Sequence, residues 1–147
     1  MVSVIVTMIM MNNKSTDVDS NLNQETVSTE EGAVKMSKMS IEINNEKFAV
    51  DLEENSTVSA LVELLPLTVS MNDLNGNEKY VYLDSSLPAN AYKPQRVEAG
   101  DVMLYGDDCL VIFYDSFDTE YSYTKIGHID SLPELGDGKL IVEFSTE

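Results

Sequence analysis

The sequence predicts a mainly β domain, a closed eight-stranded barrel with one short covering helix. From Ser40 onward, apolar and polar residues mostly alternate with a period of two, which is typical of strands that bury one face. Only one stretch, between residues 56 and 65, has apolar residues at helical spacing instead. Eight short strands around a filled interior are what a small barrel needs to close without free edges.

The strands follow from this alternation and from the turn residues between them. The turns we expect are Asn44-Asn45-Glu46, a stretch around Asn75-Gly76, and Gly106-Asp107-Asp108, the clearest hairpin. The last strand before Asp115 is continuously apolar, so we expect little exposed surface on either of its faces. The predicted strands are 41–43, 48–52, 67–71, 79–83, 101–105, 109–114, 125–129 and 139–144.

The helix is predicted from four apolar residues at positions i, i+3, i+4 and i+7, which share one face: Val58, Leu61, Val62 and Leu65. Asn55 or Ser56 can cap its start, and Pro66 ends it because proline cannot continue a helix. We expect the apolar face to cover an open end of the sheet.

Two segments precede the domain, which we place at residues 39–147. Residues 1–11 form an apolar run as long as a signal-peptide core but without its basic flank. This segment is either the remnant of an export signal or the product of a wrongly assigned start, with initiation near Met36 or Met39. Residues 12–38 are polar and hold no aromatic residue, so we expect a disordered tether. The protein is expected to be exported or on the cell surface, the alternative being the cytoplasm.

Composition excludes several functions. The 147 residues carry 26 acidic and 9 basic side chains, a net charge of -17, which argues against binding to nucleic acid. The apolar run at the N-terminus is too short to span a membrane. One cysteine and one histidine cannot form a usual zinc site, and we expect no metal and no cofactor. We expect a monomer.

Several segments, in their order along the chain, carry a family resemblance. They are Leu64-Leu65-Pro66-Leu67, residues 78–83 (EKYVYL), residues 99–106 (AGDVMLYG), residues 110–114 (LVIFY) and residues 126–129 (IGHI). Together they resemble the bacterial cyclophilin-like proteins of uncharacterised function. The resemblance covers essentially the whole domain and implies a cyclophilin-like β-barrel, without implying an activity.

The residues that make true cyclophilins prolyl isomerases do not carry over. Those enzymes use an arginine on the barrel face, a Phe-Met-x-Gln segment, and aromatic residues and a histidine around a proline pocket. This chain has no Phe-Met-x-Gln segment and no tryptophan, and its only arginine, Arg96, ends a loop beside Gln95. Isomerisation therefore stays an alternative without assigned catalytic residues, and whether the protein is an enzyme stays open.

Three further groups have plain structural interpretations. Cys109 has no basic residue within ten positions, so it is expected to be a buried, unreactive thiol. His128 faces away from Ile129 on its strand and is expected to form ordinary hydrogen bonds, with a role in the site as the alternative. The acidic residues that follow the core strand match no calcium motif and are expected to form a solvated rim.

Tyrosines are the most informative residues for function. Aliphatic residues already occupy the inward positions, so many tyrosines must lie on the other face, where tyrosine is favoured in recognition surfaces. A groove of tyrosines with Arg96 as its fixed cation would suit an anionic or peptide-like ligand. The alternative is that the tyrosines pack against the barrel exterior under loops. The candidate ligand-binding residues are Tyr80, Tyr82, Arg96, Phe113, Tyr121 and His128.

The sequence therefore predicts a non-catalytic module that binds a small molecule or a peptide. A peptidyl-prolyl isomerase is one alternative. The other is an accessory domain that binds a partner in a larger, redox-linked system.

Overall fold

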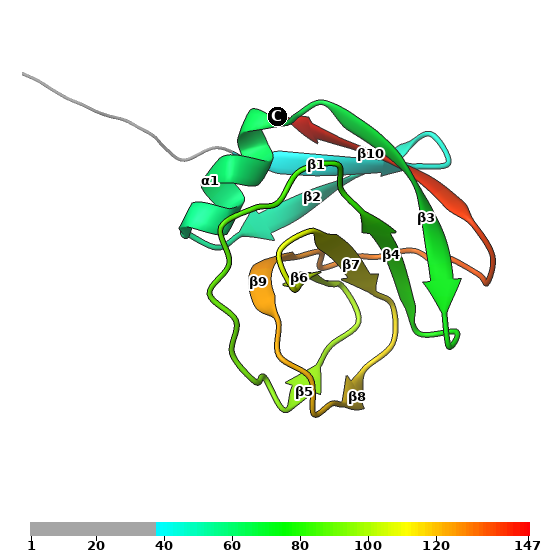
Figure 1. Cartoon of the computed structure of the whole chain (residues 1–147). Helices are drawn as coiled ribbons and strands as arrows, with labels where there is room; N and C mark the ends of the chain where they lie inside the picture. The colour runs from blue at the N-terminus through cyan, green and yellow to red at the C-terminus, as the bar shows by residue number, and fades with distance from the viewer. Residues whose placement is uncertain (1–37) are drawn as a thin grey trace, which may run out of the picture. The chain divides into compact units, whose positions relative to one another are not determined.

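The computed structural model describes residues 38–147, which hold ten strands and one helix (Figure 1). The elements are β1 (Met39–Ile43), β2 (Glu46–Leu52), α1 (Ser56–Glu63), β3 (Leu67–Leu74), β4 (Glu78–Tyr82), β5 (Arg96–Val97), β6 (Asp101–Tyr105), β7 (Cys109–Phe113), β8 (Phe117–Asp118), β9 (Thr124–His128) and β10 (Leu140–Thr146). Eight strands close an antiparallel barrel in the order β1-β10-β3-β4-β7-β6-β9-β2. The predicted fold class, a closed eight-stranded barrel with one short helix, is confirmed.

The predictions for the apolar segment 1–11 and the tether 12–38 concern residues outside the described range, apart from Lys38, and stay predictions. Within residues 38–147, no helix is long and apolar enough to cross a membrane.

Two short strands differ from the expectation of a barrel alone. β5 and β8 pair as a separate ribbon, in which Arg96 lies opposite Asp118 and Val97 opposite Phe117. Two residues are too few to show an alternating pattern, so periodicity could not predict these strands. β3 also runs three residues further than predicted, to Leu74, so the turn to β4 is correspondingly shorter.

Local residue chemistry explains the first hairpin and the helix. Asn44 and Asn45 have φ values of 53° and 68°, the left-handed conformation that a tight hairpin turn requires and that asparagine tolerates. Asn55 caps α1, because its side chain accepts a hydrogen bond of 2.8 Å from the Val58 N–H. The same amide donates to the Lys125 carbonyl at 2.9 Å and so ties the start of the helix to β9.

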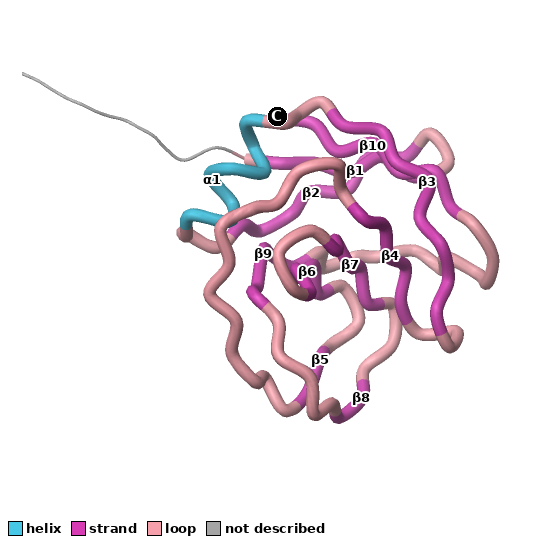
Figure 2. The backbone as a smooth tube through the Cα atoms, in the orientation of Figure 1, coloured by secondary structure: helices cyan, strands magenta, loops and turns pink. Residues whose placement is uncertain are grey.

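Two hydrophobic clusters share the central strands. Alternate residues of β6 and β7 point into the barrel, among them Leu104 and Ile112, which are fully buried. The residues between them, such as Met103 and Val111, point outward into a second cluster. Val97, Phe117 and Tyr123, which come from the chain before β6 and after β7, complete this second cluster, and the β5–β8 ribbon lies at this end of the domain (Figures 1 and 2). β7 is therefore buried along its whole length, as its apolar sequence predicts.

One of the side chains that face the barrel interior is a lysine, Lys79, which lies opposite Ile112. Lys79 is fully buried, and its ammonium donates to Asp73 Oδ1 at 3.0 Å and to the carbonyl oxygens of Gly136 and Gly138 at 2.8 and 2.7 Å. Asp73 also accepts hydrogen bonds from the Tyr114 hydroxyl and the Gly76 N–H. This cluster joins β3 and β4 to the loop before β10.

Candidate functional site

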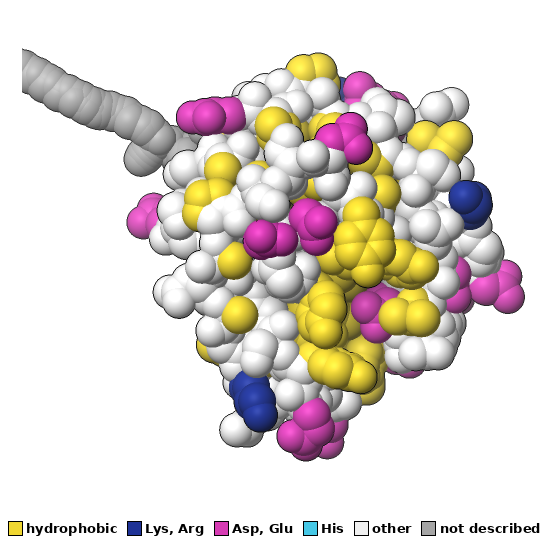
Figure 3. All heavy atoms as spheres, in the orientation of Figure 1, with side chains coloured by type: hydrophobic (Ala, Val, Ile, Leu, Met, Phe, Trp, Pro, Cys, Tyr) yellow, Lys and Arg dark blue, Asp and Glu magenta, His cyan; other side chains and the backbone are white. Residues whose placement is uncertain are grey.

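A hollow of about 670 Å³ lies on the outer face of the barrel. Its residues come from β4, β6 and β7, from the end of β3 and the turn that follows it, and from β8 and the segment between β8 and β9. Hydrophobic side chains gather around it, and one acidic side chain is set among them (Figure 3). The lining residues are Leu74, Asn75, Asn77, Glu78, Tyr80, Tyr82, Tyr105, Cys109, Val111, Phe117, Asp118, Thr119, Glu120, Tyr121 and Tyr123.

Strand register sets the order of the side chains in this hollow. Tyr82 of β4 pairs with Cys109 of β7, which in turn pairs with Tyr105 of β6. Two residues further along, Tyr80 lies opposite Val111. Because side chains alternate along a strand, Tyr80, Tyr82 and Glu78 project from the same outer face of β4.

Aromatic rings contact one another around the hollow. The Tyr80 and Tyr82 rings are 6.1 Å apart at an interplanar angle of 81°, and the Tyr105 and Tyr121 rings are 6.0 Å apart at 88°. Both are edge-to-face pairs, a favoured aromatic geometry. Tyr82 and Tyr121 remain 63% and 62% exposed, so large apolar surfaces stay open to solvent here.

A buried apolar cluster lies beneath the floor of the hollow. Phe113 is fully buried and packs against Phe117 at 5.7 Å and Tyr123 at 5.4 Å between ring centroids. Cys109 is buried in the same cluster. The rings that hold the hollow in shape therefore belong to the second hydrophobic cluster of the fold.

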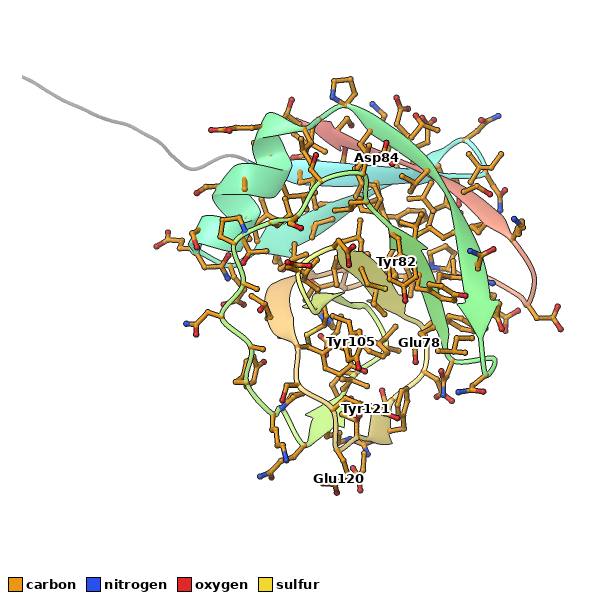
Figure 4. All side chains as sticks on the ribbon, viewed as in Figure 1. Glu78, Tyr82, Asp84, Tyr105, Glu120 and Tyr121 are labelled. Carbon is orange, nitrogen blue, oxygen red and sulfur yellow. The ribbon has the colours of Figure 1, made fainter. Side chains whose placement is uncertain are left out.

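The charged groups of the hollow are acidic. Glu78 is half-buried in its wall, and Asp118 and Glu120 lie on the segment opposite. Figure 4 shows Glu78 beside the space that Tyr82, Tyr105 and Tyr121 surround. Among the described residues, no lysine, arginine or histidine lines this hollow.

Four groups of the hollow, Glu78, Tyr82, Cys109 and Tyr123, have a pKa raised above the ordinary value. Burial, with the nearby carboxylates of Asp108 and Glu78, raises the pKa of the Cys109 thiol to about 11. Burial, followed by the Glu78 charge, raises the pKa of Tyr123 to about 12. Burial and then the Asp73 charge raise the pKa of Glu78 itself. The hollow therefore disfavours additional negative charge, and Cys109 stays a protonated, unreactive thiol at neutral pH.

Three of the six predicted binding residues, Tyr80, Tyr82 and Tyr121, line this hollow together. Phe113 lies under the floor and does not reach the hollow's surface. The structure places Arg96 elsewhere, on the exposed β5–β8 ribbon, where its guanidinium bonds to Glu98 and Asp118 at 3.1 Å each. The expected tyrosine groove with Arg96 as its cation is therefore corrected: the tyrosines come together without the arginine.

His128 also lies away from the hollow. His128 of β9 lies opposite Asp101 of β6, and its Nδ1 is 2.8 Å from Asp101 Oδ1. The other ring nitrogen, Nε2, is 3.7 Å from Asp130 Oδ1. Asp101 is buried and also accepts a hydrogen bond from the Glu98 N–H at 2.9 Å. These contacts fit the expected hydrogen-bonding histidine and connect the start of β6 to the end of β9.

Sequence reasoning missed Glu78, Tyr105 and Tyr123 as parts of the hollow. A usable signal for Glu78 was its parity, because it lies two residues before Tyr80 and four before Tyr82 and so shares their face. Tyr105 and Tyr123 depend on which strands pair, and spacing along the chain does not contain this information.

Comparisons with known proteins place the chain in a family. A model of the cyclophilin-like family matches residues 41–145. Among solved structures, the chain is similar to the solution structure of a hypothetical protein from Archaeoglobus fulgidus. The two are 21% identical, the match covers 74% of this chain and 93% of the other, and the TM-score is 0.51. This likeness shows the fold alone, and no curated protein matches the chain. The family match covers most of the described domain, and the chain therefore belongs to the cyclophilin-like family.

Proposed function

We propose that the protein is a non-catalytic binding module and that the tyrosine-lined hollow on the outer barrel face is its ligand site. The observation that carries this proposal is the convergence of five tyrosines from separate segments on one hollow: Tyr80, Tyr82, Tyr105, Tyr121 and Tyr123. Tyrosine offers a large apolar surface and a polar tip at low entropic cost, which is why it is enriched in recognition sites.

Size and construction support the same function. The volume of about 670 Å³ falls within the range of roughly 300 to 1,000 Å³ that small-molecule sites occupy. Six of the lining residues, Glu78, Tyr80, Tyr82, Tyr105, Cys109 and Val111, stand on β4, β6 and β7 of the closed barrel, and strands hold side chains more precisely than loops do. A site of this kind needs little rearrangement to receive a ligand.

The chemistry of the lining groups favours binding over catalysis. A nucleophile is activated by a lowered pKa or by an adjacent base. Cys109 and Tyr123 instead have raised pKa values, at about 11 and about 12. His128 and Arg96, two groups with which acid-base or electrostatic catalysis would be built, are not among the lining residues.

Binding can be tested by NMR titration of the full chain, labelled with ¹⁵N. The probes are three phenylbutyl compounds of equal length, 4-phenylbutylamine, 4-phenylbutanol and 4-phenylbutyrate. We expect at least one of them to cause saturable shifts at Tyr82, Tyr105 and Tyr121. Replacing Tyr82 and Tyr121 together by alanine should abolish these shifts, because both side chains are exposed and line the hollow.

The matched control is Tyr92→Ala, which removes another exposed tyrosine outside the hollow and should leave the shifts unchanged. If none of the three probes shifts the hollow residues, or if the double variant binds as well as the unchanged protein, the hollow is not the ligand site.

A further inference from the structure

We propose that the hollow selects an organic cation, an ammonium group attached to an apolar body and carried by a small molecule. This inference rests on the proposed function, because it names the class of ligand that the same hollow takes. It also reverses the charge of the ligand that the sequence suggested, because Arg96 lies outside the hollow.

The aromatic rings provide the first argument. Within the Tyr80–Tyr82 and Tyr105–Tyr121 pairs the ring planes cross at 81° and 88°, so ring faces are turned in several directions. The face of an aromatic ring carries partial negative charge and attracts a cation that lies over it. Figure 4 shows Tyr82, Tyr105 and Tyr121 on different sides of the same space, so a small cation there could lie close to more than one ring.

Glu78 provides the second argument. Its carboxylate is half-buried in the wall, and none of the ion pairs within residues 38–147 includes it. The neighbouring lysine on the strand, Lys79, points into the barrel and binds Asp73 instead. A partly desolvated charge without a counter-ion is unfavourable, and a ligand cation would supply the missing partner.

The electrostatics of the hollow agree with these contacts. The thiol of Cys109 and the phenol of Tyr123 both have a raised pKa, owing first to burial and then to nearby carboxylates that include Glu78. Burial opposes a charge of either sign, whereas the Glu78 charge opposes a new anion and attracts a cation. Asp118 adds less to this attraction than Glu78 does, because Arg96 bonds to Asp118 at 3.1 Å.

The charge of the ligand is tested with the same three phenylbutyl probes, measured on the full chain by calorimetric titration at neutral pH. They differ only in their end group, so their order of affinity reports charge preference. We expect the amine to bind about five- to tenfold more tightly than the alcohol, as one half-buried ion pair predicts, and the acid to bind most weakly.

A variant at Glu78 tests the assigned partner. Glu78→Gln should lower the affinity for 4-phenylbutylamine about five- to tenfold and leave that for 4-phenylbutanol unchanged. The matched control is Glu46→Gln, which makes the same charge change at an exposed hairpin residue outside the hollow. At the rings, Tyr121→Phe should keep amine binding and Tyr121→Leu should weaken it, because only phenylalanine retains an aromatic face.

The outcomes separate this inference from the proposed function. If the alcohol or the acid binds in the hollow as tightly as the amine, the cation preference is refuted while the binding function stands. If no probe binds, both fail. If Glu78→Gln and Glu46→Gln weaken amine binding equally, the net charge of the protein and not Glu78 attracts the cation, and the assignment of Glu78 is overturned. A short glycine peptide with one central lysine that binds more tightly than the amine would refute a small-molecule source.

Discussion

Lys79 offers a quantitative test of how the barrel tolerates a buried charge. Its ammonium bonds to Asp73 and to two carbonyl oxygens, and its apolar stem is fully enclosed. Lys79→Met removes the charge and keeps most of the stem, whereas Lys79→Ala removes both. The two variants therefore separate the polar contacts from the packing.

The polar contribution is expected to be moderate. After Lys79→Met, Asp73 keeps its bonds from Tyr114 and Gly76 and is 16% exposed to water. The two freed carbonyls belong to exposed glycines, where water can replace the lysine. Because no fully buried charge is left without a partner, we expect Lys79→Met to lower the free energy of unfolding by about 1 to 3 kcal/mol.

The packing contribution adds to this. Lys79→Ala also removes three buried methylene groups, each worth ~0.8 kcal/mol, or about 2.4 kcal/mol together. The cavity that remains increases the loss, so we expect a total of about 4 to 6 kcal/mol.

Urea unfolding of the full chain, followed by circular dichroism, measures both variants. With a slope of about 1.5 kcal/mol/M, the alanine variant should unfold at a midpoint more than about 1 M below that of the methionine variant. If Lys79→Met is as destabilising as Lys79→Ala, the ammonium contacts and not the enclosed stem stabilise this position, and the reasoning is refuted.

Three further predictions concern the acid cluster, the helix cap and a crowded glycine. The hydrogen bond from Tyr114, followed by the contact with Lys79, lowers the pKa of Asp73 in the folded protein below 3.8. The ionised Asp73 carboxylate therefore stabilises the fold fully above the pKa of the unfolded chain, and this stabilisation is lost as the pH falls through the folded pKa. Asp73→Asn should therefore weaken the dependence of the free energy of unfolding on pH between about pH 5 and pH 2, as measured by urea unfolding. An unchanged pH dependence would show that Asp73 is not the group responsible. Asn55→Ala should cost at least about 1 kcal/mol in thermal unfolding, because the amide also bonds to β9; no loss would contradict the cap. In Gly127→Ala the new Cβ would lie 2.5 Å from a β2 carbonyl oxygen, so the melting temperature should fall; an unchanged melting temperature would contradict the crowding.

The barrel was predictable because its evidence is local. Alternation along each strand marks the faces, and Asn44-Asn45, Asn75-Gly76 and Gly106 mark the turns. The burial of β7 on both faces followed from its five consecutive apolar residues. The cap at Asn55 was one of two alternatives, and the structure selects it.

The site was only partly predictable because it depends on pairing between strands. Tyr80 and Tyr82 share a face by their spacing alone, but their nearness to Tyr105 requires β4, β7 and β6 to be neighbours in that order. Arg96 was placed wrongly because its two acidic partners hold it on a ribbon that has no periodic pattern. The buried Lys79 was equally hard to foresee, since its partners Gly136 and Gly138 follow almost sixty residues later.

The position of the hollow on the central strands has a practical consequence for finding its ligand. β7 contributes Val111 to the hollow and Ile112 to the barrel interior, so the site cannot unfold without the rest of the domain. A compound that binds only the folded site therefore stabilises the whole domain. At a concentration one hundred times its dissociation constant, it raises the free energy of unfolding by about 2.7 kcal/mol. A melting-temperature screen of a compound library, enriched in amines, should therefore detect ligands whose chemical identity has not been guessed in advance.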